Sequence, residues 1–332
     1  MSGGGVLLDP QQLKLLKEYR LERPLTSCHW DVRSRYVFCG AEDYVIHRVA
    51  VADGVVTKLV GHDSWVRAFG SSPDGEVLYS GGYDGRLMFW PVVGDVLMPM
   101  RVIEGHRGWI RGLAVSGDGR RVATCGNDRL VKEWDGATGQ LLQEYAGHGA
   151  HVYNVQYSLD GARLYSCDLK GVVHEWRAGV SQPRVVATVS ELHGYDTTFR
   201  ADIGGARSIA LHSDGRQLGL GGITRVSNAF AGVGEIVVAV LDVMDGKLRQ
   251  VLGSKDRTVG TTWGLSWHRG GYWIGLTGGG GGGWLYFWRG DAADEFFRLK
   301  LPSDGRGVGV STAGSGIAVA HADGQLRLYG VG

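Results

Sequence analysis

The chain has 332 residues and a formal net charge of +1, from 35 Lys and Arg against 34 Asp and Glu. A chain of this length can bury a sizeable core, as one large domain or two smaller ones. Its balanced charge gives no overall field that would attract nucleic acid or an anionic membrane, so neither is predicted as a partner and charge-driven binding requires a local patch.

Glycine is abundant, with 56 residues dispersed among hydrophobic runs, which indicates many turns. The four cysteines, Cys28, Cys39, Cys125 and Cys167, lack C-x-x-C spacing and lie in or beside apolar strand-like runs. They are predicted to be buried free thiols in a reducing compartment. The chain shows no signal-peptide pattern and no apolar run of membrane-spanning length, so we expect a cytoplasmic protein.

The first predicted element is "LLKEY" at residues 15–19, which is similar to the internal segment "LLQEY" at residues 141–145. This similarity predicts a strand there, with residues 1–14 as an N-terminal extension. A short amphipathic helix after Asp9 and Pro10 is the alternative, and it can coexist with part of the strand. Residues 15–332 are predicted to form a single domain.

Three segments that follow align without a gap. They are "GHDSWVRAFGSSPDGEVLYSGGYDGRLMFW", "GHRGWIRGLAVSGDGRRVATCGNDRLVKEWD" and "GHGAHVYNVQYSLDGARLYSCDLKGVVHEW", starting at Gly61, Gly105 and Gly147. Each contains three short alternating strands separated by turn residues. A repeat whose copies start at this spacing, with Gly-His at the start and Trp-Asp at the end, resembles the WD40 β-propeller family.

Weaker copies, one before the three clear repeats and three after them, bring the number of units to seven, which is within the range of known propellers. The resemblance therefore implies an all-β, seven-bladed WD40-like propeller. The outer strand of each blade comes from the segment before the next Gly-His. The last unit lacks this strand, so we expect the N-terminal strand to close the ring by pairing with the C-terminal blade.

His, Ser or Thr, Asp and Trp recur at the same spacing in the clear repeats, which favours structure over catalysis because an active site rarely occurs several times in one chain. The resemblance implies a buried hydrogen-bond network in each blade. In the third clear repeat Lys170 stands where the aspartate is expected, so its network is in doubt. The predicted network residues are His62, Ser80, Asp84, Trp90, His106, Thr124, Asp128, Trp134, His148, Ser166 and Trp176.

Function is expected in residues that vary between blades. The resemblance implies that the residue opening each first strand lies at the rim of the central channel, on the Gly-His face that usually contacts peptides. Arginines there suit carboxylate or phosphate, and aromatic rings add stacking. The alternative is that these arginines pair with turn carboxylates: Asp43, Asp84, Asp128 and Asp323. The predicted rim residues are Arg67, Arg111, Tyr153, Arg207, Trp263 and Arg306, with Trp65, Trp109 and Tyr83 beside them and Thr26 in the first blade.

Two long loops extend the same face, "ELHGYDTTFRADIGGAR" before the fifth unit and "TRVSNAFAGVG" within it. They add Tyr195, Arg200 and Phe230 as candidate binding residues. The run Gly278–Gly283 aligns with the turn between the second and third strands of the sixth unit, where its excess of glycine indicates close approach by a neighbouring loop or a ligand.

The sequence thus predicts a non-enzymatic interaction scaffold, monomeric when alone, that binds a protein or peptide partner through an acidic or phosphorylated segment. No metal or cofactor is predicted, because the histidines form no recognised ligand spacing. The alternative is a propeller enzyme or small-anion receptor, with its site over the channel at the loops of the fourth to sixth blades.

Overall fold

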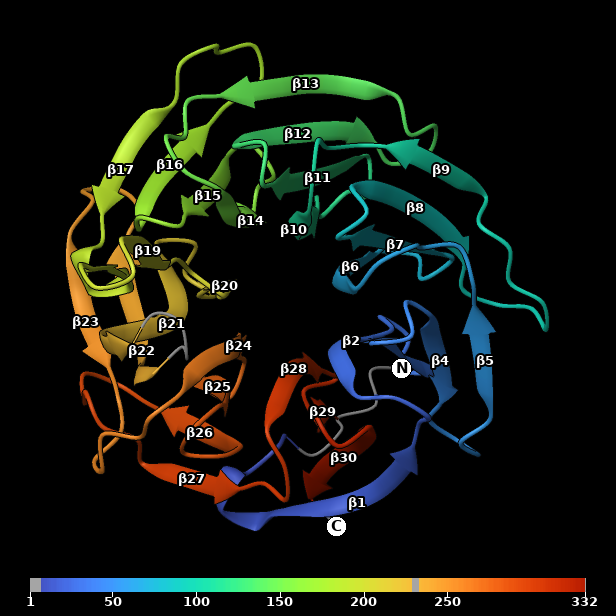
Figure 1. Ribbon diagram of the computed structural model, residues 1–332. Helices are drawn as coiled ribbons and strands as arrows, with labels where there is room; N and C mark the ends of the chain where they lie inside the picture. The colour runs from blue at the N-terminus through green and yellow to red at the C-terminus, as the bar shows by residue number, and fades with distance from the viewer. Residues whose placement is uncertain (1–6, 229–232, 332) are drawn as a thin grey trace.

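The protein is described here by a computed structural model that covers residues 7–228 and 233–331. These residues form seven four-stranded antiparallel sheets and one two-stranded hairpin. Figure 1 shows the sheets arranged as blades around a central axis, with the first strand of each blade innermost. The predicted all-β, seven-bladed propeller is confirmed.

The first three blades follow one another along the chain without additional elements. Blade 1 contains β2 (Leu25–Trp30), β3 (Tyr36–Ala41), β4 (Ile46–Ala50) and β5 (Val56–Leu59). Blade 2 contains β6 (Val66–Ser71), β7 (Val77–Gly82), β8 (Arg86–Pro91) and β9 (Arg101–Glu104). Blade 3 contains β10 (Ile110–Val115), β11 (Arg121–Gly126), β12 (Leu130–Asp135) and β13 (Leu141–Ala146).

Blades 4 to 6 are separated by the longer connections. Blade 4 contains β14 (Val152–Tyr157), β15 (Leu164–Asp168), β16 (Val172–Trp176) and β17 (Arg184–Thr188). Blade 5 contains β20 (Ser208–Leu211), β21 (Gln217–Asn228), β22 (Val233–Asp242) and β23 (Leu248–Leu252). Blade 6 contains β24 (Thr261–His268), β25 (Tyr272–Gly278), β26 (Trp284–Trp288) and β27 (Phe297–Lys300).

Blade 7 joins the two ends of the chain. Its three C-terminal strands are β28 (Gly305–Val310), β29 (Gly316–His321) and β30 (Gln325–Val331), and β1 (Leu13–Arg20) pairs with β30 as the outer strand (Figure 1). The predicted N-terminal strand and ring closure are therefore confirmed. The alternative helix is reduced to a single 3₁₀ turn, η1 (Pro10–Gln12), which is capped by the Asp9 carboxylate.

Apolar side chains fill the spaces between neighbouring blades. In the cluster between blades 1 and 2, Phe38 and Ile46 of blade 1 pack with Leu78, Met88 and Trp90 of blade 2. All five are fully or almost fully buried. Because each blade buries one face against the next, the core is continuous only when the ring is complete.

The glycine run forms the turn between β25 and β26, as the sequence predicts. Gly279 and Gly282 have φ values of +124° and +75°, in the region that favours glycine. A Cβ atom on Gly283 would stand 2.1 Å from the carbonyl oxygen of Ser303, and one on Gly281 would stand 2.6 Å from that of Val259. Close approach by neighbouring loops therefore accounts for these glycines.

The two predicted long loops are largely regular structure. The segment before blade 5 forms η2 (Ser190–Leu192) and a hairpin of β18 (His193–Asp196) and β19 (Ala201–Gly204). The segment within blade 5 extends β21 and β22 beyond the length of other blade strands, and residues 229–232 lie outside the described part. The β18–β19 hairpin packs against the extended β21.

Candidate functional site

The recurring His, Ser or Thr, Asp and Trp residues form closed hydrogen-bond networks. In blade 2 the Trp90 indole donates to Ser80 Oγ at 2.8 Å, and Ser80 Oγ lies 2.8 Å from His62 Nε2. His62 Nδ1 lies 2.9 Å from the carboxylate of Asp84. Blade 3 repeats this arrangement with Trp134, Thr124, His106 and Asp128. Each polar side chain of these two networks has a hydrogen-bond partner, which is the arrangement expected of a structural network.

Blade 4 corrects one expectation. Lys170 does not interrupt the network, because the carboxylate comes from Asp168, two residues earlier, at 3.1 Å from His148 Nδ1. His148 Nε2 lies 2.7 Å from Ser166 Oγ, which also accepts a bond from the Trp176 indole at 2.7 Å. Asp168 also accepts the backbone N–H groups of residues 170 and 172. The network is therefore complete, with its aspartate at a shifted position.

The network carboxylates are held in their ionised form. Burial alone would raise the pKa of Asp84, but hydrogen bonds from His62 and from backbone N–H groups outweigh it, and the pKa is lowered. The same balance of causes lowers the pKa of Asp128 and Asp168. Because these carboxylates accept hydrogen bonds within their networks, they provide no free base or nucleophile.

The rim residues owe their position to a β-bulge repeated around the ring. In blade 2 the pairing of β6 with β7 runs from Val66 directly to Ala68, so Arg67 is an additional residue in its strand. A bulge bends the strand and redirects the side chain of the extra residue. The register skips the predicted rim residue in five further blades, at Thr26, Arg111, Tyr153, Trp263 and Arg306. In blade 5 Arg207 directly precedes β20.

These side chains converge on two adjoining cavities at the channel. The deeper cavity, of about 250 Å³, is lined by residues that include Arg67, Arg111, Arg207, Trp263 and Arg306. The outer cavity, of about 330 Å³, is lined by Trp65, Arg67, Tyr83, Trp109, Arg111, Tyr153, Arg207 and Trp263. Nine predicted rim residues are thus brought together. Thr26 is buried, and its hydroxyl donates to the Val66 carbonyl oxygen at 2.7 Å.

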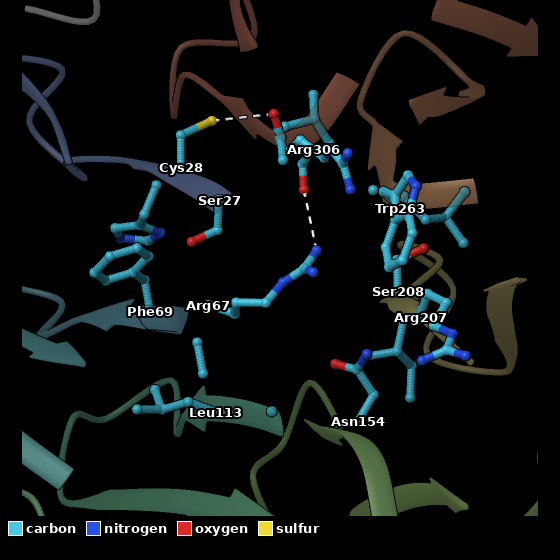
Figure 2. Close-up of a pocket in the computed structure, with 18 of the residues that line it drawn as sticks. Ser27, Cys28, Arg67, Phe69, Leu113, Asn154, Arg207, Ser208, Trp263 and Arg306 are labelled. Atoms are coloured by element: carbon cyan, nitrogen blue, oxygen red, sulfur yellow. Dashed lines mark hydrogen bonds between the residues drawn. The ribbon is translucent and has the colours of Figure 1, made fainter. Parts of the chain in front are cut away.

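Guanidinium groups and aromatic rings alternate around the mouth. The Tyr153 ring lies between two guanidinium groups, with the Cζ atoms of Arg111 and Arg207 at 4.2 and 4.3 Å from its centroid. Arg67 reaches across the cavity from blade 2 toward blades 6 and 7 (Figure 2). Its Cζ lies 4.8 Å from the Trp263 ring centroid, and its Nη2 donates to the Arg306 carbonyl oxygen at 3.4 Å. We call Arg67, Arg111, Arg207 and Arg306 the arginine layer.

Among the described residues, the arginine layer has no acidic counterpart. In the described part of the chain, no carboxylate oxygen lies within 4.0 Å of a nitrogen of these four guanidinium groups. The alternative pairing is therefore wrong: Asp43 bonds to His47, Asp84 to His62, Asp128 to His106 and Asp323 to Arg327. Arg111 Nε donates to Asn127 Oδ1 at 2.6 Å, whereas the buried Nε of Arg207 has no hydrogen-bond partner within residues 7–228 and 233–331.

The positive charges of the arginine layer repel one another. Burial lowers the pKa of Arg67, and the phenol of Tyr83 opposes this change. The neighbouring charges of Arg207 and Arg306 lower the pKa of Arg67 further. A cluster of like charges that lacks a counterion is electrostatically costly, and an anion bound among them would remove that cost.

The remaining candidate residues lie apart from the two cavities. Tyr195 and Arg200 are exposed on the β18–β19 hairpin and line neither cavity. In the same hairpin, His193 Nε2 lies 2.7 Å from Asp202 Oδ1. Phe230 lies outside the described residues. The hairpin is thus a separate surface of blade 5 and not a wall of the channel.

The described residues contain neither a helix that could cross a membrane nor a cluster of metal ligands. None of their helices has the length and apolar character needed to cross a membrane. Over residues 7–228 and 233–331, no three or more His, Cys, Asp or Glu side chains are grouped as they would need to be to hold a metal ion. All four cysteines are buried and unpaired, as the sequence predicts.

Comparison with known families places three of the blades. The family model described as WD domain, G-beta repeat matches residues 54–91, 97–135 and 139–177. Each match starts shortly before an outer strand and ends at, or one residue after, the end of the third strand of the next blade. No curated protein matches the chain. Blades 2 to 4 are therefore WD40 repeats, and the closed seven-bladed ring that contains them is consistent with the WD40 repeat family.

Proposed function

We propose that this protein is a non-enzymatic interaction platform that docks an anionic segment of a protein partner on its Gly-His face. WD40 propellers typically mediate protein–protein interactions. The observation that carries the proposal is the arginine layer, whose guanidinium groups have no carboxylate within ion-pair distance among the described residues. Charged groups without a partner are rare in folded proteins and are common at binding sites.

The aromatic rings around the layer support a peptide as the ligand. Trp65 and Trp109 are 39% and 42% exposed, which leaves their rings available to a partner. Tryptophan and arginine are the residues that most often dominate protein interfaces. The balanced charge of the whole chain also favours a local docking site over general attraction to nucleic acid or membrane.

Affinity capture with charge-neutralising variants tests the proposal. Arg111→Gln removes one charge from the layer, while Arg120→Gln removes one from the exposed turn at the opposite end of β10. We expect partners captured by the unaltered protein and by Arg120→Gln to be lost or strongly reduced with Arg111→Gln. Equal capture by all three proteins, with equal circular dichroism spectra, would contradict docking at this face.

A small-anion receptor is the second candidate, and the dimensions of the deeper cavity favour it. A cavity of about 250 Å³ is slightly below the usual range for drug-sized ligands and suits a compact anion. Thermal-shift measurements with phosphate, nucleotides and dicarboxylates separate the two candidates. A dicarboxylate that raises the melting temperature indicates a small-anion receptor, whereas no shift with dicarboxylates indicates a peptide platform; phosphate-bearing probes can bind to either.

The same proposal includes a cytoplasmic location and a monomeric state for the isolated protein. Buried free thiols support a reducing compartment. Ring closure by β1 supports a monomer, because it pairs the outer edge of β30 within the chain. Size-exclusion chromatography with light scattering tests the monomer; a stable dimer at micromolar concentration would contradict it.

A further inference from the structure

The wall of the channel becomes more apolar below the arginine layer. The next channel-facing positions along the first strands, two residues after each arginine or after Trp263, are apolar. Because an ionised group loses its partners when it enters an apolar environment, the charged end of a ligand stops at the arginine layer. These apolar lining residues are Phe69, Leu113, Ile209, Leu265 and Val308.

Polar side chains at the same depth are already used within the protein. Ser27 Oγ donates to the Val66 carbonyl oxygen at 2.9 Å, and Ser208 Oγ donates to that of Thr262 at 3.3 Å. Asn154 Nδ2 donates to the Ala206 carbonyl oxygen at 3.0 Å. Guanidinium N–H groups remain as donors for a ligand, among them the buried Nε of Arg207, which has no hydrogen-bond partner among the described residues.

The number of positive charges selects the ligand. Four arginines line the deeper cavity, and no acidic side chain does so in the part of the chain that the structure describes. A carboxylate neutralises one positive charge, whereas a phosphomonoester carries a charge of about −1.5 to −2 near neutral pH and offers three acceptor oxygens. Guanidinium groups that approach from three blades can each bond to a different phosphoryl oxygen, an arrangement that a planar carboxylate cannot match.

We propose that the arginine layer binds the phosphoryl group of a phosphomonoester, with the aromatic rings of the mouth contacting the group that carries it. The inference deepens the proposed docking function and rests on it for the choice of face. A phosphorylated peptide side chain and a small free phosphomonoester share this chemistry. The stacked Tyr83 and Trp109 rings provide a flat apolar surface above the layer for either ligand.

Isothermal titration calorimetry with phenyl phosphate and benzoate tests the phosphoryl preference, because both probes carry the same ring. We expect phenyl phosphate to bind at least about tenfold more tightly than benzoate, and Arg207→Gln to lose about tenfold for phenyl phosphate, as for loss of a hydrogen bond to a charged group. Arg120→Gln is the matched control and should bind as the unaltered protein does. If Arg207→Gln fails to fold, Arg111→Gln replaces it. Equal binding of the two probes, or equal loss in both variants, overturns the inference.

Two peptide pools separate this inference from the docking function. They are seven-residue pools with randomised flanks, one with a central phosphoserine and one with a central glutamate. Arginine-dependent binding of the phosphoserine pool alone supports both proposals. Binding of phenyl phosphate but of neither pool supports a small phosphomonoester and contradicts peptide docking. Equal, arginine-dependent binding of both pools supports docking and overturns the phosphoryl preference.

Discussion

The rings of Tyr83 and Trp109 stack face to face across the boundary between blades 2 and 3, with centroids 4.2 Å apart and planes inclined by 3°. The Cζ atom of Arg111 lies 4.8 Å from the centroid of Trp109 and 5.9 Å from that of Tyr83. The pair therefore forms a platform that holds one guanidinium group of the arginine layer in place.

Removal of this platform is predicted to weaken ligand binding more than it weakens the fold. Trp109→Ala should lower the affinity for phenyl phosphate by about three- to tenfold, the range of one cation–π contact. Tyr195→Ala is the control, because the Tyr195 ring is exposed on the β18–β19 hairpin and lines neither cavity. Calorimetry that shows equal losses for both variants would contradict the role of the platform.

Arg67→Met is predicted to stabilise the ligand-free protein while it weakens phosphate binding. The methionine keeps an apolar contact with Trp263 and removes the repulsion that Arg207 and Arg306 exert on Arg67. We expect a gain of about 1 kcal/mol, or on the order of 2 °C in melting temperature. Differential scanning calorimetry in an anion-free buffer measures it. A marked fall in melting temperature would show that Arg67 serves the fold and not a ligand.

Asp168→Ala is predicted to destabilise blade 4 by about 1–3 kcal/mol, because His148 Nδ1 and two backbone N–H groups lose their buried acceptor. Lys170→Ala should change stability by less than about 0.5 kcal/mol, because the Lys170 side chain is exposed and pairs only with Asp202 at 3.4 Å among the described residues. Chemical denaturation of the two variants checks the contrast. A similar loss of stability in both variants would mean that Lys170 also has a structural role.

Acid is predicted to remove the stabilising effect of Asp242 in blade 5. Burial would raise its pKa, but the hydrogen bond from Arg249, the Met244 N–H group and the charges of Arg216 and Arg249 outweigh burial and lower it to about 2. The folded state thus holds the proton less tightly than the unfolded chain, so the stabilisation is complete above about pH 4 and declines as the pH falls toward 2.

The melting temperature of Asp242→Asn compared with that of the unaltered protein measures this contribution. The difference between them should be largest above pH 4 and should shrink as the pH falls toward 2, where the carboxyl group becomes protonated. A difference that stays constant over this interval would mean that Asp242 titrates alike in the folded and unfolded chain.

Deletion of residues 1–20 is predicted to open the ring. Without β1 the backbone of β30 loses its outer partner, and Arg327 loses its hydrogen bond to Glu18. An unpaired strand edge favours association with a second chain. Light scattering should therefore show oligomers and calorimetry a lower melting temperature; a monomer with unchanged melting temperature would show that β1 is dispensable.

The repeats made the fold predictable, because Gly-His, turn residues and third-strand tryptophans mark blades 2 to 4 at a nearly constant spacing, and weaker copies fill the rest of the chain. They also located the rim residues, since one position read around the ring brings Arg67, Arg111 and Arg306 together. The bulge that turns these side chains toward the channel was not predicted. It depends on the register between paired strands, which an alignment of the repeats does not show.

Other features depended on contacts that spacing does not record. Asp168 replaces the expected aspartate from a position two residues earlier, and only the fold shows that its carboxylate still reaches His148. The absence of carboxylates near the arginine layer could not be read from sequence either, because Asp84 and Asp128 precede turns on the same face. In the structure they are turned toward His62 and His106 instead.

A crystal structure of the protein with phenyl phosphate tests the central claim most directly. We predict density for the phosphoryl group among the guanidinium groups of Arg67, Arg111 and Arg207, with the phenyl ring toward the Trp109 side of the mouth. Phosphoryl density on the outer surface of the propeller, or an arginine layer left empty at saturating ligand, would contradict the claim.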